Sequence, residues 1–150
     1  VEMCSMRASQ FSNNQISKKN IVMGSNLEIP FDDNFFDLII SINTIHYSIE
    51  EDIFASLKLW KKKLKEKGRI FVETAGPTHD FVVDSKRISK NKWTCGEKSG
   101  FRKGSLAGFF DSEDHWKTCI QKIFNEVSFG RIIEKSNKST LDYLTAYCVK

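Results

Sequence analysis

The sequence contains few prolines and glycines, and it has no long apolar run. Its 150 residues include two prolines and eight glycines, which excludes collagen-like and low-complexity architectures. Its apolar stretches are only a few residues long, such as residues 38–40, so none is long enough to span a bilayer. No basic segment followed by an apolar one opens the chain, so we expect no signal peptide and a cytoplasmic protein without membrane contact.

Cysteine pairs and net charge are limited as well. The four cysteines are scattered and form no C-x-x-C pair, so we expect reduced thiols and no metal site. The formal net charge is +4, from 23 basic and 19 acidic side chains. An excess this small permits an anionic partner without demanding one, and it disfavours nucleic acid. A chain of this length is large enough to bury a core without disulfides.

Short apolar runs bounded by polar residues predict the strands. The run at residues 35–42 is almost continuously apolar, which is typical of a strand buried on both faces. Polar residues between the last two runs suit a hairpin turn. We expect strands at residues 20–23, 35–42, 69–74, 129–135 and 141–149.

Apolar residues at helical spacing predict two main helices between these strands. The first runs from residue 49 to about residue 67, opened by a capping box at Ser48 and closed by Gly68. The second runs from residue 113 to about residue 127, capped by Ser112. The alternation predicts an α/β fold: a mostly parallel, Rossmann-like sheet with helices on both faces and an antiparallel C-terminal edge hairpin.

The stretch from residue 24 to residue 47 carries a family resemblance. Ile29-Pro30-Phe31, Asp33 and Phe36-Asp37 lead into the apolar strand. This spacing, with the Lys-Gly-Arg segment near residue 68, resembles the class I S-adenosylmethionine-dependent methyltransferases of the type 11 (ubiquinone/menaquinone-methyltransferase-like) group. The resemblance implies a Rossmann-like enzyme that transfers a methyl group to a small molecule, and it treats residues 1–150 as one partial domain.

Two departures from the family pattern concern the start of the fold. The glycine-rich loop of the family has no counterpart, so by this resemblance the first strand–helix unit lies upstream of Val1. The turn residue that is usually Asp is Ser25. A sheet without its first strand would expose an apolar slot beside the central strand, and we expect poor solubility or self-association at that edge.

The resemblance implies a binding site for S-adenosylmethionine at the carboxyl ends of the strands. It gives Glu2 the ribose hydroxyls, Met3 the adenine face, and Ser25 and Asn26 the adenine amino group. Each also has a plain structural reading: a solvated glutamate, a core methionine and ordinary turn residues. The cofactor-binding residues implied are Glu2, Met3, Ser25, Asn26, Ser41, Ile42 and Asn43.

Residues that follow the next strands are candidates for the methyl-acceptor side. His46 is a tentative general base, because a histidine pKa can lie near neutrality, although a lone histidine after a strand is more often structural. Tyr47, His79 and Trp93 are the other candidates, and residues 84–108 read as an insertion over the acceptor. The alternative function is a non-catalytic Rossmann-like module that binds a protein or nucleic acid through this basic insertion.

Overall fold

The computed structural model describes residues 3–4, 6, 20–90 and 92–150. The chain divides into two compact units, residues 1–31 and residues 32–150, each described here by itself. In the first unit the polypeptide turns at Asn26, and Ser25 and Glu28 form an isolated antiparallel bridge with N···O distances of 3.0 and 3.1 Å. The predicted strand at residues 20–23 is wrong, because no neighbouring strand in the described part of the chain pairs with it.

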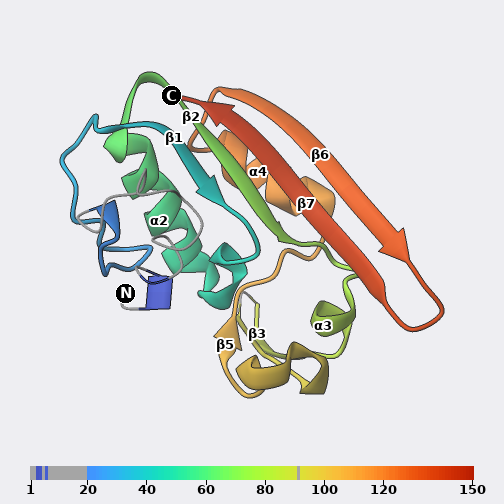
Figure 1. Cartoon of the computed structure of the whole chain (residues 1–150). Coiled ribbons are helices and arrows are strands. Elements are labelled where there is room, and N and C mark those ends of the chain that lie inside the picture. Colours follow the sequence, from blue (N-terminus) through green and yellow to red (C-terminus); the bar gives the residue numbers. More distant parts are fainter. Residues whose placement is uncertain (1–2, 5, 7–19, 91) are drawn as a thin grey trace. The chain divides into compact units, whose positions relative to one another are not determined.

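A four-stranded sheet organises the second unit, in the order β1-β2-β7-β6 (Figure 1). The strands β1, β2 and β6 run the same way. Only β7 runs against them, because it pairs antiparallel with both β2 and β6. The α/β class and the C-terminal hairpin are therefore confirmed. The bounds are Phe36–Ser41 for β1, Leu64–Ala75 for β2, Glu126–Lys135 for β6 and Thr140–Val149 for β7.

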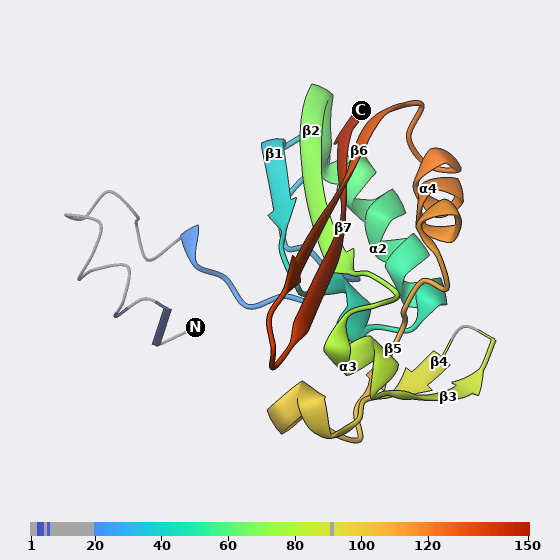
Figure 2. The same ribbon diagram turned by 90° about the vertical axis from the view of Figure 1, so that its right-hand side faces the viewer.

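Helices α2 (Glu50–Lys63) and α4 (Glu113–Gln121) both lie against one face of this sheet, where we had predicted helices on both faces (Figure 2). The reason is topological. The connections from β1 to β2 and from β2 to β6 cross the sheet in the same direction, and right-handed crossovers in one direction leave their helices on one side. A helix on the other face requires a crossover in the opposite direction; within residues 32–150 as described the strand order reverses only at the β6–β7 hairpin, which carries no helix.

The core lies between these helices and the sheet. Every second residue of β2 and β7 faces the helices, as the two-residue period of a strand dictates. Buried side chains of α2 and α4 fill the space above them. The core residues with at most 4% exposure include Ile53, Leu57, Trp60, Ile70, Val72, Trp116, Ile120, Leu144, Ala146 and Cys148.

The first helix differs from its prediction at both ends. Its N-cap is Ile49 with no side-chain capping bond, so the capping box at Ser48 does not form. The helix stops at Lys63, and the chain turns directly into β2 at the fully buried Leu64. Gly68 is therefore a strand residue and not a cap. Helical spacing places Leu64 in the core in either structure, so the pattern alone did not locate the boundary.

The second helix and the final hairpin follow their predictions more closely. The hydroxyl of Ser112 accepts a hydrogen bond from the His115 amide at 3.1 Å, which confirms the predicted cap. The helix ends at Gln121, six residues early, and Ile123 and Phe124 fill the core from the turn that follows. The pairing of β6 with β7 confirms the hairpin. No described helix is both long enough and apolar enough to cross a membrane.

The polar segment after β2 folds into small elements of its own. A short helix, α3 (Asp80–Val83), is followed by a three-stranded antiparallel sheet and a 3-10 turn, η3 (Glu97–Arg102). Trp93 and Phe109, 7% and 1% exposed, anchor this small sheet to the end of β2. The small sheet comprises β3 (Lys86–Ser89), β4 (Lys92–Thr94) and β5 (Leu106–Ala107).

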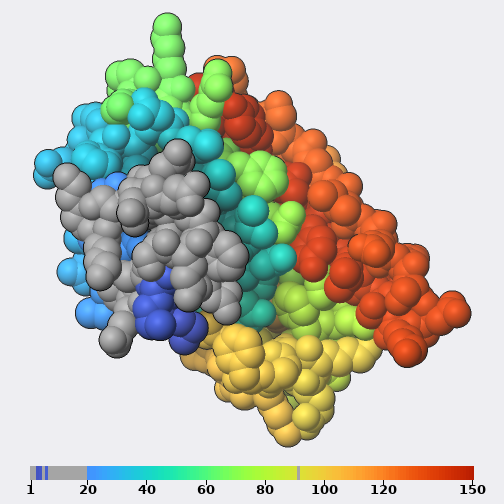
Figure 3. Space-filling view, viewed as in Figure 1, coloured from blue at the N-terminus to red at the C-terminus, as the bar shows by residue number. Residues whose placement is uncertain are grey.

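No helix of residues 32–150 as described lies on the sheet face opposite α2 and α4, and β6 and β7 reach the surface there (Figure 2 and Figure 3). The predicted burial of residues 35–42 on both faces is wrong: Leu38, Ile40 and Ile42 are 47%, 59% and 52% exposed. In the described part of the chain β1 pairs only with β2, so it is an edge strand with one uncovered apolar face. A continuous apolar run shows that both faces of a strand are suited to burial, but it does not show that both faces are buried.

Candidate functional site

The candidate site lies where β1 and β2 end. The two strands are adjacent and parallel, so their carboxyl ends meet at one edge of the sheet. A 3-10 turn, η2 (Ile45–Tyr47), follows β1, and the segment leading into α3 follows β2. The β1–α2 connection and the end of β2 thus meet, and His46 contacts Thr74 and Ala75, which lie 28 and 29 positions away in the sequence.

Asn43 has two unusual properties for a residue just after β1. Its φ is 51°, in the left-handed region that side-chain-bearing residues seldom occupy, so the loop holds it in a strained conformation. Its side-chain Oδ1 is buried and has no hydrogen-bond partner in the described part of the chain. Nearby, the Ser41 and Thr44 hydroxyls lie 2.8 Å apart and fix the turn. An unsatisfied buried acceptor suits a donor group on a bound ligand.

His46 lies beneath this turn with no exposed surface. Its Nδ1 accepts from the Ala75 amide at 3.4 Å and lies 3.3 Å from the Thr74 hydroxyl. Because Nδ1 is the acceptor, the proton of the neutral ring is on Nε2, which is buried without a partner among the described residues. Burial, with the charges of His79 and Arg102, lowers the pKa of His46 to about 3.

These features do not fit the predicted role of His46 as a general base. At neutral pH the ring is uncharged, its one acceptor nitrogen already receives a backbone N–H, and a pKa near 3 makes it a poor proton acceptor. The physical cause is desolvation, which a sequence pattern does not reveal. The group that His46 offers is instead a fixed N–H donor.

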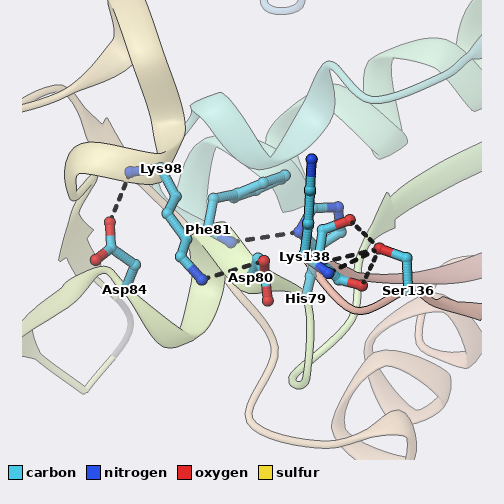
Figure 4. Close-up of polar contacts among 8 residues, drawn as sticks. His79, Asp80, Phe81, Asp84, Lys98, Ser136 and Lys138 are labelled. Carbon is cyan, nitrogen blue, oxygen red and sulfur yellow. Dashed lines mark hydrogen bonds and ion pairs between the residues drawn. The ribbon is translucent and has the colours of Figure 1, made fainter.

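His79 has the same arrangement at the end of β2. It is 3% exposed and forms the N-cap of α3, where its Nδ1 accepts from the Phe81 amide at 3.4 Å (Figure 4). Its Nε2 is also buried and without a hydrogen-bond partner in the portion described. Burial lowers its pKa, and the nearby Asp142 and Asp80 oppose that shift. His79 is therefore a second neutral imidazole.

One aromatic side chain links the two histidines. The Phe81 ring centroid lies 5.3 Å from that of His46 and 3.9 Å from that of His79. Tyr47 packs on His46 at 4.4 Å, and the Arg102 guanidinium covers the Tyr47 ring at 4.6 Å. We call His46, Tyr47, His79 and Phe81 the ring cluster. It forms an apolar wall around two polar N–H groups.

Trp93 lies behind the ring cluster and not in it. Its ring packs edge-on against Phe109 at 5.7 Å, and Arg87 covers its other side at 4.8 Å. It is 7% exposed. Trp93 therefore supports the small sheet and presents little surface to a ligand, contrary to the acceptor-binding role predicted for it.

Asp142 on β7 holds the β2–α3 connection in place. Its carboxylate is fully buried and accepts from the Thr78 amide at 2.9 Å and the Thr78 hydroxyl at 2.7 Å. Arg131 on β6 completes the arrangement with two contacts of 2.9 Å. Burial alone would raise the pKa of Asp142, but these hydrogen bonds outweigh it and the pKa is lowered. Sequence inspection missed this residue, because it lies sixty-four positions from Thr78.

Three of the basic side chains of residues 84–108, Arg87, Lys98 and Lys103, pair with acids of the same unit. Lys98 binds Asp80 through Nζ at 3.1 Å, and its amide donates to Asp84 at 2.8 Å, which ties η3 to α3 (Figure 4). Lys103 pairs with Glu97, and Arg87 pairs with an aspartate at 3.0 Å. A segment whose cations are paired in this way does not favour the polyanion-binding alternative.

The remaining predicted residues lie at the strand end or in the first unit. Ser41 is 6% exposed and closes β1, and Ile42 is exposed beside it. Ser25 and Asn26 form the predicted turn, Met3 is exposed, and Glu2 lies outside the described residues. Their roles toward a cofactor stay predictions.

Solved methyltransferases share this architecture. A SAM-dependent methyltransferase from Methanosarcina mazei matches with a TM-score of 0.73, at 12% identity over 100% of this chain and 76% of that one. One from Archaeoglobus fulgidus has a TM-score of 0.58, at 14% identity over 99% and 80%. A Burkholderia thailandensis 1,6-didemethyltoxoflavin-N1-methyltransferase, solved with 1,6-didemethyltoxoflavin and S-adenosylhomocysteine, has 0.63, at 12% over 98% and 56%. The fold is that of the Rossmann-like methyltransferases.

A family model matches part of the sequence. Residues 2–72, just under half of the chain, match the family model described as a methyltransferase domain. No curated protein matches the chain. This partial match and the fold are both similar to S-adenosylmethionine-dependent methyltransferases, in line with the resemblance that the sequence carries.

Proposed function

We propose that this chain forms the part of a methyltransferase that binds the methionine end of S-adenosylmethionine and positions a small-molecule acceptor. The observation that carries the proposal is Asn43. A strained asparagine with an unsatisfied buried oxygen stands at the carboxyl end of β1, where ligands bind in parallel α/β sheets. The cofactor-bound Burkholderia thailandensis protein, which has the same fold, supports this reading.

The residues at this edge suit the cofactor. When bound, S-adenosylmethionine supplies a methyl group already activated on a sulfonium, so the protein has mainly to align the two reactants, a contribution of roughly 7–11 kcal/mol in favourable cases. The Oδ1 of Asn43, which no described residue of the chain engages, is an acceptor of the kind that a protonated amine needs. The Ser41–Thr44 hydroxyl pair holds the loop that carries it.

The ring cluster is the proposed acceptor side. His46 and His79 each offer one Nε2–H, and both are neutral at physiological pH because burial lowers each pKa. Neutral donors orient an oxygen or nitrogen acceptor atom of the substrate but do not remove its proton. The wall formed by Tyr47 and Phe81 favours a flat, weakly charged compound. The proposed mechanism is therefore alignment of the acceptor with the cofactor, with the acceptor's proton passing to solvent.

The test is calorimetric titration of the intact protein with S-adenosylmethionine and S-adenosylhomocysteine. Asn43→Ala should weaken binding of both ligands by about tenfold, the effect of losing one buried hydrogen bond to a charged group. Asn34→Ala is the matched control. Asn34 has the same left-handed backbone, with φ of 56°, but precedes β1 at the opposite end of the strand. It should leave both affinities unchanged.

Two results would contradict the proposal. The first is the absence of heat from either ligand at high micromolar concentration with folded protein. The second is equal weakening by Asn43→Ala and Asn34→Ala, which would trace the effect to backbone strain and not to a cofactor contact.

A further inference from the structure

Three metal-ligating side chains meet away from the candidate site. Glu50 opens α2, while His115 and Cys119 lie four residues apart on α4 and so share one face of that helix. One ligand atom from each residue lies within 4.8 Å of the other two. The scattered cysteines predict no metal site, because no two of them lie close together in the sequence. This cluster joins residues up to sixty-nine positions apart.

The cluster is buried but reachable. Glu50 and Cys119 are 7% and 3% exposed, and the side chain of His115 retains 28% of its surface. The His115 Nε2 lies 3.3 Å from a Glu50 carboxylate oxygen, so the acid and the imidazole already face each other. A buried carboxylate is costly unless it is paired or bound to a metal, and beside His115 and Cys119 the Glu50 carboxylate is placed for either.

We propose that Glu50, His115 and Cys119 bind one Zn²⁺ ion, with water as the fourth ligand. Carboxylate oxygen, imidazole nitrogen and thiolate sulfur are the three donor types that zinc takes in proteins. Tetrahedral zinc separates such donors by about 3.5 Å. The His115–Glu50 pair at 3.3 Å already fits this separation, and a pair as far apart as 4.8 Å has to close by on the order of 1 Å. Side-chain rotation on rigid helices can supply that movement.

Binding exchanges one proton for the metal. The Cys119 thiol loses its proton to solvent as the sulfur–zinc bond forms. The imidazole binds zinc in its neutral form, through one ring nitrogen and with its proton on the other. The bound ion would join the start of α2 to α4, the two helices that cover the sheet. It would therefore stabilise the folded protein in proportion to its free concentration, independently of any cofactor.

Cobalt substitution tests the site with a readout separate from activity. Co²⁺ is titrated into the reduced intact protein in a reductant that does not bind metals. The expected result is a thiolate-to-cobalt charge-transfer band in the near ultraviolet, with visible bands of tetrahedral intensity, all displaced by Zn²⁺. Cys119→Ser should abolish the charge-transfer band, and His115→Gln should weaken cobalt affinity at least about tenfold, because even residues behind the ligands have effects of that size.

Cys4→Ser is the control, because Cys4 is the exposed cysteine and the obvious alternative thiolate. It should leave the band and the affinity unchanged. The proposal is overturned if folded wild-type protein gives no band at millimolar Co²⁺, if the band survives Cys119→Ser, or if Cys4→Ser removes it. His115 is partly exposed, so His115→Gln gives a folded test even where Cys119→Ser destabilises the core. Unchanged affinity in His115→Gln would also overturn the proposal.

Discussion

Asp142→Ala should be among the most destabilising single substitutions at a polar residue of the sheet. The carboxylate has no exposed surface and receives four hydrogen bonds, two from Thr78 and two from Arg131. Hydrogen bonds to charged groups contribute about 1.5–3 kcal/mol each, but they are not additive. The Arg131 side chain is 29% exposed and also lies 3.6 Å from Glu113. Water and Glu113 can therefore replace much of the interaction with Asp142 that the substitution removes.

The loss should therefore come mainly from Thr78. Its amide and hydroxyl would face the space left by the carboxylate, and the β2–α3 connection would lose its anchor on β7. We expect a decrease of about 2–4 kcal/mol in the free energy of unfolding. The measurement is urea denaturation followed by circular dichroism, with an unchanged slope and a lower midpoint.

Asp37→Ala is the matched control for this experiment. Asp37 also pairs with a base, Lys65 at 2.8 Å, but its side chain is 81% exposed. Exposed pairs contribute about 0–1 kcal/mol, so this variant should change stability little. If Asp142→Ala costs no more than Asp37→Ala, burial does not set the strength of the interaction and the reasoning fails.

The pH dependence of Asp142→Asn follows from the same network. The folded pKa of Asp142 is lowered from its ordinary value of 3.8. The stabilisation is thus fully present above 3.8 and is lost as pH falls through the folded pKa. The stability difference between wild type and Asp142→Asn should shrink in acid. A difference that is constant from neutral pH into strong acid would show that the charge plays no part.

Two further predictions concern other residues. His46→Gln should make the free energy of unfolding depend less on pH in acid. The pKa of His46 falls from 6.5 to about 3 on folding, so the unfolded chain takes up a proton between these values. The wild type therefore loses up to about 1.4 kcal/mol of stability per pH unit in that range and is unaffected above 6.5. Equal slopes in the two proteins, measured by denaturation at several pH values, would refute a buried neutral ring. Ile40→Ser should reduce self-association in sedimentation velocity, since Ile40 is 59% exposed on the edge strand. The control Ile132→Ser, at a residue on β6 that is 55% exposed, should leave self-association unchanged. If Ile40→Ser and the wild type have the same association state, the β1 edge is not the contact.

Local patterns in the sequence predicted most of the elements of the second unit. The Ser112 cap and the β6–β7 hairpin depend on neighbouring residues, and both form as predicted. Element ends were less predictable. Leu64 reaches the core equally well as the last turn of a helix or the start of a strand, so periodicity could not choose between them.

The sequence indicated some residues of the candidate site but not their protonation or their distant partners. His46 and His79 attract notice because each follows a strand, and the parallel pairing of those strands brings both to one edge. Their protonation could not be predicted, because it depends on burial by Phe81 and on which nitrogen meets a backbone amide. The residues next to Asp142 in the sequence do not indicate its role, because an acid in an apolar strand is explained only by the partners that it meets in the fold.

The sequence by itself determined the α/β class, the methyltransferase resemblance and the closing hairpin, because these depend on spacing between near neighbours. The tertiary structure alone decided that β7 lies between β2 and β6, that α2 and α4 share one face, and that Glu50 meets Cys119. Such contacts join residues far apart in the chain. Their formation depends on the burial and hydrogen bonding of the whole fold, which no short segment encodes.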